Sequence, residues 1–221
     1  WMHRWPDLVG VTLNLQSRPS NLLFGPETHT LAGRDWLHER FAGLVLQING
    51  DTFFQVHTSQ AERVVPLLES ALEHPCGLLV DAYCGIGTYS LPMARHGWNV
   101  LGIEQHPGAV DSARINASLN GLEDRCRFQC GDVALALTEL LPDCAALLLD
   151  PPRKGLDPQV LASIGACPPQ TLAYLSCDPA TLARDLRGLC DFGYRLMSVQ
   201  PMEFFPNTSH VETLAVLRRE I

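Results

Sequence analysis

Cys177 stands where a thiol could do chemistry. The segment YLSCDP (174–179) is apolar up to Leu175 and then turns polar before a proline, which is the pattern of a strand that ends at a loop. A thiolate at a strand end can act as a covalent nucleophile. A buried structural thiol is the competing interpretation, and it fits the other seven cysteines better, because several of them lie inside apolar runs. The position therefore favours Cys177 as a reactive residue.

Two polar side chains follow another apolar run. The segment DPPRKG (150–155) comes directly after the apolar residues 145–149. Its two prolines remove backbone donors and stiffen the loop, which would hold Asp150 and Arg153 at the mouth of a site. Enzymes that methylate exocyclic amino groups place an aromatic residue after such a D/N-P-P segment, whereas Arg153 occupies that place here. This argues against methylation of an exocyclic nitrogen.

A glycine-containing turn points to an adenosine ligand. The segment DAYCGIGT (81–88), with Tyr83, Gly85 and Thr88, ends one apolar strand, and Glu104 ends the next strand about 20 residues further on. Glycines at such a turn let the backbone approach a ligand, and the carboxylate can accept both ribose hydroxyls. The GxG pair alone is equally compatible with a tight structural turn. The third glycine of a dinucleotide fingerprint is missing, which argues against a nicotinamide cofactor.

Asp132 and Asp150 add two carboxylates, each expected at the end of a later strand. A cationic sulfonium and an adenine amino group both suit such acceptors. We therefore expect S-adenosylmethionine as the cofactor.

Glu212 precedes the last apolar strand and is ambiguous from the sequence. A lone glutamate at this place is more commonly a solvated strand-edge residue than a catalytic base. His210, in the same loop, fits an ordinary loop residue, and we assign it no catalytic role.

These side chains need a sheet to position them. Residues 1–58 read as a small β-rich element, with apolar runs at 8–15 and 44–48, and a helix is predicted from Ser59 to before Pro75. Beyond it, the expected strand and helix pairs are 78–84 with 89–96, 99–104 with 109–120, 126–132 with 133–140, 145–150 with 159–164, and 171–177 with 180–190, followed by strands at 194–201 and 213–218.

This alternation predicts an α/β fold with a Rossmann-like, doubly wound and mostly parallel sheet. Its ligands should lie beyond the carboxyl ends of the strands. We expect two domains, a small β-rich element at 1–58 and an α/β domain at 59–221.

The composition limits the cellular setting and the possible partners. No run of about 18 apolar residues appears and the first residues do not resemble a signal peptide, so we expect a cytoplasmic protein without a membrane partner. The eight cysteines lack paired short spacings, so we expect reduced thiols and no metal. The net charge of −8 argues mildly against a broad basic surface for nucleic acid.

Five motifs together resemble one enzyme family. They are FFQV (53–56), DAYCGIGTYSLPMA (81–94), DPPRKGLD (150–157), SCDPATLARDL (176–186) and HVET (210–213). They stand in the order found in the RNA 5-methyluridine methyltransferases. From about residue 8 to its end, the chain resembles the catalytic part of that family, and more its bacterial 23S ribosomal RNA branch than its transfer RNA branch.

The resemblance implies a fold, a reaction and a set of residues. The sheet would be a methyltransferase sheet whose last strand is antiparallel, residues 59–221 would form a SAM-dependent methyltransferase domain, and residues 1–58 would be a partial RNA-contacting element. The reaction would be methyl transfer from S-adenosylmethionine to C5 of a single-stranded or flipped uridine, expected in 23S rRNA, through a covalent bond between a cysteine and C6. By that resemblance Cys177 is the nucleophile and Glu212 the base. The residues at the family's cofactor positions are Gln55, Tyr83, Gly85, Thr88, Glu104, Asp132 and Asp150. From its loop position, Arg153 or Asp150 could orient the uracil. Phe53 or Phe54 could pack near the base, although an aromatic pair inside a β-rich stretch more often belongs to the core.

The chain departs from the family pattern in three ways. His57 and Asp178 each stand where the family usually has Asn, and the amino-terminal RNA-binding barrel with its cluster-binding cysteines is missing from this sequence. The first two departures are compatible with the chemistry. The missing barrel would supply much of the phosphate contact, which offers an explanation for the acidic charge.

Four alternatives stay open. A transfer RNA uridine-C5 methyltransferase differs only in its substrate. A cytosine-C5 RNA methyltransferase also uses a cysteine after the fifth strand, but would normally carry a second cysteine in the DPPRKG loop. A small-molecule methyltransferase suits the acidic pI of 5.4 but leaves the pair of Cys177 and Glu212 unexplained. A catalytically silent RNA-binding module needs no cofactor. We expect a monomer.

Overall fold

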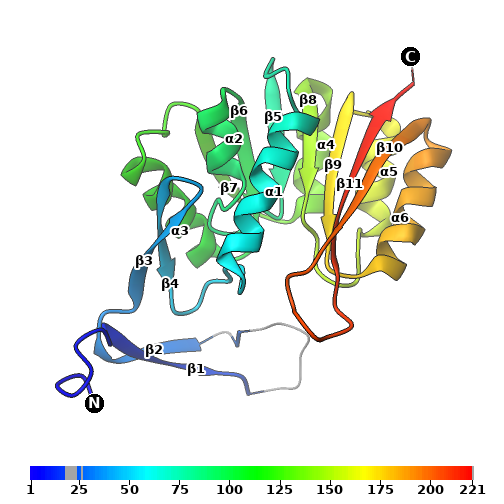
Figure 1. Cartoon of the computed structure of the whole chain (residues 1–221). Coiled ribbons are helices and arrows are strands. Elements are labelled where there is room, and N and C mark those ends of the chain that lie inside the picture. The colour runs from blue at the N-terminus through cyan, green and yellow to red at the C-terminus, as the bar shows by residue number, and fades with distance from the viewer. Residues whose placement is uncertain (18–23, 26, 221) are drawn as a thin grey trace.

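A seven-stranded sheet forms the centre of the molecule (Figure 1). The computed structural model describes residues 1–17, 24–25 and 27–220. In the order of the sheet, its strands are β10 (Tyr194–Met202), β11 (Glu212–Arg219), β9 (Thr171–Ser176), β8 (Cys144–Leu149), β5 (Leu78–Ala82), β6 (Asn99–Glu104) and β7 (Cys126–Cys130).

Five of these strands, from β9 to β7, pair in parallel, whereas β11 pairs antiparallel with both β9 and β10. The predicted α/β class with a mostly parallel, doubly wound sheet and an antiparallel last strand is therefore confirmed.

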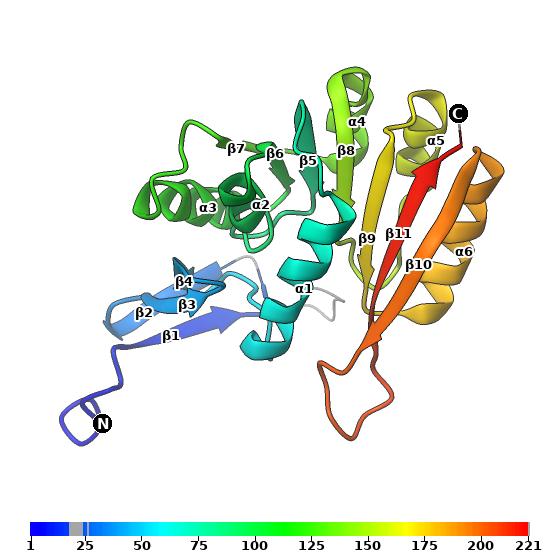
Figure 2. The same cartoon turned by 45° about the horizontal axis from the view of Figure 1, so that its top comes forward.

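Helices cover both faces of the sheet (Figure 2). One face carries α1 (Thr58–Ala71), α2 (Ser90–His96) and α3 (Pro107–Leu119), and the other carries α4 (Val133–Leu140), α5 (Pro158–Ala166) and α6 (Pro179–Asp191). Because side chains alternate along a strand, Leu79 of β5 packs under the first three helices and Val80 under the other three. Burial on both faces explains why these strands read as nearly continuous apolar runs.

Four of these helices begin at a side-chain cap. His106 caps α3, Asp132 caps α4, Asp157 caps α5 and Asp178 caps α6, each by accepting a backbone N–H of the first turn. A proline at the first helical position, where no amide donor is needed, supports α3, α5 and α6. Asp132 and Asp178 follow the carboxyl ends of β7 and β9, so the caps also fix those two loops.

Two short hairpins precede the sheet. They pair β1 (Gly10–Leu15) with β2 (Glu27–Gly33), and β3 (Trp36–Phe41) with β4 (Leu44–Asn49). Residues 18–23 and 26 of the predicted β-rich element lie outside the described residues. Asn116 and Asn120 of α3 exchange hydrogen bonds with the backbone of β4, at 2.6–3.2 Å, and Phe41 and Leu46 are fully buried in the core under α1–α3. The loop after β4 is thereby anchored to the sheet. The domain boundary at residue 58 stays a prediction.

A buried carboxylate ties α6 to the loop after β8. Asp185 is fully buried, and its Oδ2 accepts hydrogen bonds from the Leu156 backbone amide and the Tyr174 hydroxyl, both at 2.8 Å. Its Oδ1 pairs with the Arg184 guanidinium at 2.7 Å, which in turn donates to the Lys154 carbonyl at 2.9 Å. The loop that carries the DPPRKG segment is therefore held by helix α6.

Within the described part of the chain, no helix is long and apolar enough to cross a membrane. The same residues place no group of three or more His, Cys, Asp or Glu side chains where they could hold a metal ion.

Asp185→Ala should destabilise the fold strongly. It leaves the Tyr174 hydroxyl and the Leu156 amide buried without an acceptor, so we expect a loss of about 2–4 kcal/mol in the free energy of unfolding. Urea unfolding measures this loss. Asp191→Ala, at the exposed end of the same helix, is the control and should stay within about 0.5 kcal/mol of the wild type. Equal stability of the two variants would contradict the anchoring role.

Candidate active site

A small pocket opens at the carboxyl ends of β5 and β8. It is lined by Phe53, Gln55, Asp81, Tyr83, Cys84, Gly85, Thr88, Tyr89 and Asp150. Six of these nine were expected at the site from the sequence. The structure brings them together from three segments far apart in the chain, which are the loop after β4, the turn after β5 and the end of β8.

The turn after β5 has a strained backbone. Tyr83 has a φ of 70°, and Gly85 has a φ of 54°, so both adopt the left-handed region that non-glycine residues rarely enter. The backbone amides of Tyr83 and Cys84 donate to the Ile103 carbonyl of β6 at 2.9 and 3.0 Å. These bonds hold the turn in its unfavourable conformation, which is the kind of strain found where a ligand approaches backbone.

Glu104 lies at the end of β6, as predicted. Its Oε2 accepts the Gly85 amide at 3.1 Å and its Oε1 accepts the His106 amide at 2.8 Å. The carboxylate is therefore fixed beside the turn, and each oxygen keeps a lone pair for a further donor. A ribose with two neighbouring hydroxyls matches this arrangement.

Asp132 lies after β7 and is exposed. Its Oδ1 accepts the Ala134 and Leu135 amides at 2.8 and 3.2 Å, which leaves Oδ2 free of a bond to these amides. Asp132 also raises the pKa of Tyr83, after burial and Asp157, so it lies on the same side of the site as the turn. Its cap role and a ligand contact are compatible.

Cys177 and Glu212 lie next to each other across two paired strands. Thr213 of β11 is opposite Ser176 of β9 in an antiparallel ladder. One step beyond this pair, the register places Glu212 beside Cys177, and side chains opposite each other point to the same face. The electrostatics agree. Burial raises the pKa of the Cys177 thiol most, and Glu212 is the charged group that raises it next most.

Four charged or titratable groups share this corner. The pKa of Glu212, a buried residue, is raised to about 7 by burial, and the Arg153 guanidinium opposes that rise. Burial also raises the pKa of Asp150 well above its ordinary value, with Glu212 as the first contributing charge. Asp150 adds to the rise at Cys177, and Arg153 opposes it. Asp150 therefore connects the pocket to the pair of Cys177 and Glu212. Perturbed carboxyls gathered in this way are typical of functional sites.

The remaining predicted residues lie around these groups. Phe53 is about half exposed, at 51%, whereas Gln55 and Thr88 are buried. Arg153 is exposed, and its carbonyl accepts the Thr181 hydroxyl of α6 at 3.2 Å. Asp178, the departure after the cysteine, accepts the Thr181 amide at 2.8 Å as the cap of α6. Asp and Asn cap helices equally well, so this substitution preserves the position of Cys177.

The sequence analysis missed three pocket residues, Asp81, Cys84 and Tyr89, of which Cys84 was expected to be a structural thiol. Asp81 is 2% exposed, accepts a hydrogen bond from the Ser90 hydroxyl, and has a pKa raised to about 7 by burial. A carboxylate inside an apolar strand was the available signal. Tyr89 is 4% exposed and follows the glycine turn, and a polar aromatic at the start of an apolar helix was its signal.

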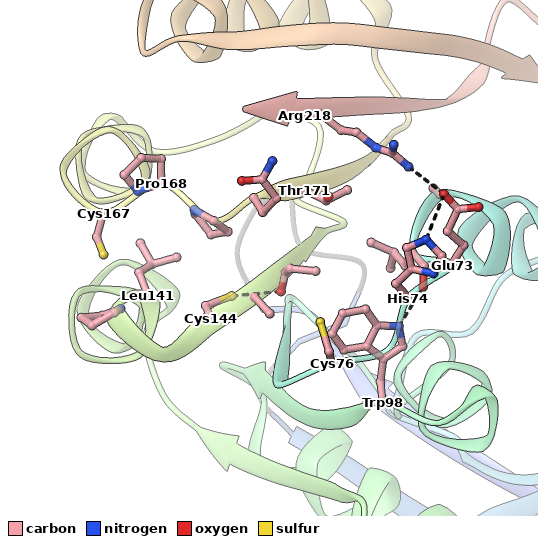
Figure 3. Close-up of a pocket in the computed structure, with 17 residues that line it drawn as sticks. Glu73, His74, Cys76, Trp98, Leu141, Cys144, Cys167, Pro168, Thr171 and Arg218 are labelled. Atoms are coloured by element: carbon pink, nitrogen blue, oxygen red, sulfur yellow. Dashed lines mark hydrogen bonds and ion pairs between the residues drawn. The ribbon is translucent and has the colours of Figure 1, made fainter. Parts of the chain in front are cut away.

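A larger cavity, of about 440 Å³, lies at the opposite edge of the sheet (Figure 3). Trp98 and the thiols of Cys76, Cys144 and Cys167 line it, and an ion pair between Arg218 and Glu73 closes one side. None of the residues predicted for the site lines this cavity. Open α/β sheets bind their ligands at the carboxyl ends of the strands, so the smaller pocket is the candidate active site.

Comparison with known proteins agrees with this geometry. A model of the tRNA (uracil-5-)-methyltransferase family matches residues 38–220. An uncharacterized RNA methyltransferase from Parasynechococcus marenigrum is 52% identical in an alignment of 223 positions that covers 99% of this chain and 48% of that protein. A second, from Gloeobacter violaceus, is 48% identical over 219 residues, 99% of this chain and 47% of that protein. The chain thus spans about half the length of the curated relatives it matches.

Two solved structures show the same fold. The Pyrococcus abyssi tRNA (uracil-54, C5)-methyltransferase, in complex with S-adenosyl-L-homocysteine, aligns with a TM-score of 0.80 and 27% identity, over 98% of this chain and 52% of that one. A SAM-dependent methyltransferase from Agrobacterium tumefaciens aligns with a TM-score of 0.66 and 16% identity, over 89% of this chain and 73% of that one. With the family model matching most of its residues, the chain belongs to the tRNA (uracil-5-)-methyltransferase family.

Proposed function

We propose that this chain carries the catalytic unit of an S-adenosylmethionine-dependent RNA methyltransferase that methylates C5 of a uridine, with Cys177 as nucleophile and Glu212 as base. One observation carries the proposal. The antiparallel register of β9 and β11 puts a thiol and a buried carboxylate side by side, next to a pocket built on a glycine turn.

The cofactor is S-adenosylmethionine, and the residues present fit it. The Pyrococcus neighbour was solved with the demethylated form of this cofactor. Glu104 is oriented to accept ribose hydroxyls, and Asp81 and Asp150 make the pocket acidic, which suits a cationic sulfonium. Gln55, Tyr83, Gly85, Thr88 and Asp132 complete the cofactor site. When bound, the cofactor supplies an electrophilic methyl group.

Cys177 solves the central chemical problem. C5 of uracil is too weak a nucleophile to take a methyl group unaided. Addition of the thiolate at C6 forms the sulfur–C6 bond and moves the electrons of the C5–C6 double bond toward C5 and O4, which makes C5 enolate-like. Burial, Glu212 and Asp150 raise the pKa of the Cys177 thiol, whereas the Arg153 guanidinium lowers it. The start of α6, whose cap follows Cys177 directly, also favours the thiolate.

Glu212 completes the reaction. After methyl transfer, C5 carries both the new methyl group and its original hydrogen. The Glu212 carboxylate takes that proton, the electron pair restores the C5–C6 double bond, and the sulfur–C6 bond breaks. Both residues are therefore needed for turnover.

The substrate is a uridine that has left any base stack, because a stacked base could not enter a pocket of this kind. Phe53 is exposed enough to stack against this base, and Arg153 acts on both Cys177 and Glu212, which puts it near the reacting ring. We place the target in 23S rRNA, on the sequence motifs. A tRNA uridine is the second candidate, because the Pyrococcus neighbour acts on uracil 54 of tRNA. With a net charge of −8, this chain relies on contacts from elsewhere in the full-length protein for much of its grip on phosphates.

Cys177→Ala should abolish adduct formation. With 5-fluorouridine-containing RNA and S-adenosylmethionine, the wild type should form a complex that survives a denaturing gel, because fluorine at C5 cannot leave as a proton. The variant should form none, and its turnover on natural RNA should fall by roughly 10³-fold or more. Cys190→Ala, at an exposed thiol of α6, is the control and should behave as wild type. An adduct in Cys177→Ala would contradict the assignment.

Glu212→Gln should separate the two halves of the reaction. The amide cannot accept the C5 proton, so methyl transfer should proceed once and the adduct with natural uridine should persist. We expect kcat to fall by about 10²–10⁴-fold, with covalent complex visible on denaturing gels without fluorine. Free release of methylated RNA at the wild-type rate would exclude Glu212 as the base.

The pH dependence should follow the raised pKa of Glu212. Its free-enzyme pKa is about 7, and only the deprotonated carboxylate can act as base. The decay of the covalent adduct isolates Glu212, because the Cys177 thiol, whose own pKa is raised, has already reacted by then. In a single turnover, the rate at which the adduct decays to product should rise about tenfold per pH unit up to about pH 7 and level off above it. An ordinary glutamate would give a rate that stays flat down to about pH 5. Measuring this rate between about pH 5.5 and 8.5 distinguishes the two, and the flat profile would exclude a buried base.

A further inference from the structure

The Tyr89 hydroxyl is buried without a hydrogen-bond partner. Among the residues that the structure describes, it is the one buried side-chain nitrogen or oxygen atom that lacks a hydrogen-bond partner. Tyr89 is 4% exposed and lines the candidate active-site pocket together with Asp150 and Gln55. Buried polar atoms almost always have a partner, so an unpaired one needs an explanation. A binding site awaiting its ligand is one such explanation.

A phenylalanine at position 89 could make the same packing contacts as the ring of Tyr89. It packs edge-on against Phe41, with ring centroids 6.1 Å apart and planes at 69°, inside the apolar cluster under α1–α3. It precedes α2 directly and makes no side-chain cap hydrogen bond there. Packing and helix initiation therefore account for the ring and leave the hydroxyl unexplained.

Carboxyl groups surround the hydroxyl on the pocket side. Asp150, Glu212 and Asp81, from three different strands, are the charges that act on it, and together with burial they raise its pKa well above the ordinary value. The phenol therefore stays protonated and can only be useful as a donor. No acceptor among the described residues receives its proton, so the hydroxyl is free to donate to a ligand that enters the pocket.

We propose that the Tyr89 hydroxyl donates a hydrogen bond to O4 of the target uracil. This inference rests on the proposed function and adds a residue to it. When Cys177 forms its bond to C6, negative charge moves through C5 to O4, so a donor at O4 gains strength as the reaction proceeds. The neighbours of Tyr89 support this choice, because Asp150 and Glu212 belong to the corner where the base reacts. Carboxylates at this corner would repel an enolate, so a neutral donor is useful here.

The test is Tyr89→Phe in the full-length protein, with three measurements. The first is the single-turnover rate of adduct formation at saturating S-adenosylmethionine, using a 5-fluorouridine-containing 23S rRNA transcript. The second is S-adenosylmethionine affinity by calorimetry, and the third is Tm. We expect the rate to fall by about 10²-fold, as for loss of one oxyanion donor, with cofactor affinity unchanged. Since the variant removes an unpaired buried hydroxyl, its Tm should stay equal or rise by about 2 °C.

Tyr194→Phe is the matched control. Its hydroxyl is also buried, but it donates to the Pro169 carbonyl at 2.6 Å, away from the pocket. This variant should lower Tm and leave the adduct rate unchanged, which is the opposite of the result expected for Tyr89→Phe.

Each other outcome overturns the inference in a recognisable way. A wild-type adduct rate in Tyr89→Phe means that the hydroxyl makes no productive contact with the base. A weaker cofactor affinity with an unchanged rate at saturation means that the acceptor belongs to the cofactor. A wild type that forms no adduct with the 23S rRNA transcript or with a 5-fluorouridine-containing tRNA transcript removes the proposed function itself, and the inference with it.

Discussion

The pairing of β11 with β9 is the constraint on which the rest of the site depends. β11 runs antiparallel to β9, so it begins at the end of the sheet where β9 finishes. The first residues of β11 therefore lie beside the last residues of β9. Here that brings Glu212 to the side of Cys177, although 35 positions separate them in the sequence. The ladder ends at the pair of Thr213 and Ser176, so Glu212 lies at the start of β11, Cys177 lies one residue beyond the end of β9, and each is held by the strand next to it. A base and a nucleophile that must act on adjacent atoms of one ring need this kind of rigid spacing.

Burial gives this corner its unusual electrostatics. Three carboxyl groups, on Asp81, Asp150 and Glu212, lie at the end of the sheet where the parallel strands finish, and burial raises the pKa of each. Their position costs stability, because each would be better solvated on the surface. The same feature makes the pocket a favourable place for a positively charged ligand. It also raises the pKa of Glu212 to about 7, so that its carboxyl group can both accept and release a proton near neutral pH. The Arg153 carbonyl accepts a hydrogen bond from Thr181 of α6. Its guanidinium counteracts part of the rise in the pKa of Glu212 and of Cys177.

Much of this arrangement was predictable from the sequence. Apolar runs alternating with amphipathic segments predicted the sheet, since strands buried on both faces leave a strong signal. Glu104 and Asp150 were found because they end such runs. The hairpin strands β2 and β3 were not predicted individually, because ETHTLAG and WLHERF are mostly polar and exposed.

Contacts between distant segments could not be predicted from the sequence. The role of Glu212 stayed ambiguous in isolation, since strand register cannot be read from a pattern of one strand. Asp81 and Tyr89 were missed because their significance lies in burial and in the partners they have or lack, which only packing decides.

The account is tested most directly by release of tritium from RNA labelled at C5 of its uridines. If Cys177 and Glu212 act on adjacent atoms of one uracil, each methyl group transferred by the wild type must displace one tritium into water. We therefore predict a one-to-one ratio of tritium released to methyl groups incorporated, with no net release when S-adenosylmethionine is omitted. Methyl incorporation without tritium release would place the reaction at another atom and contradict the account.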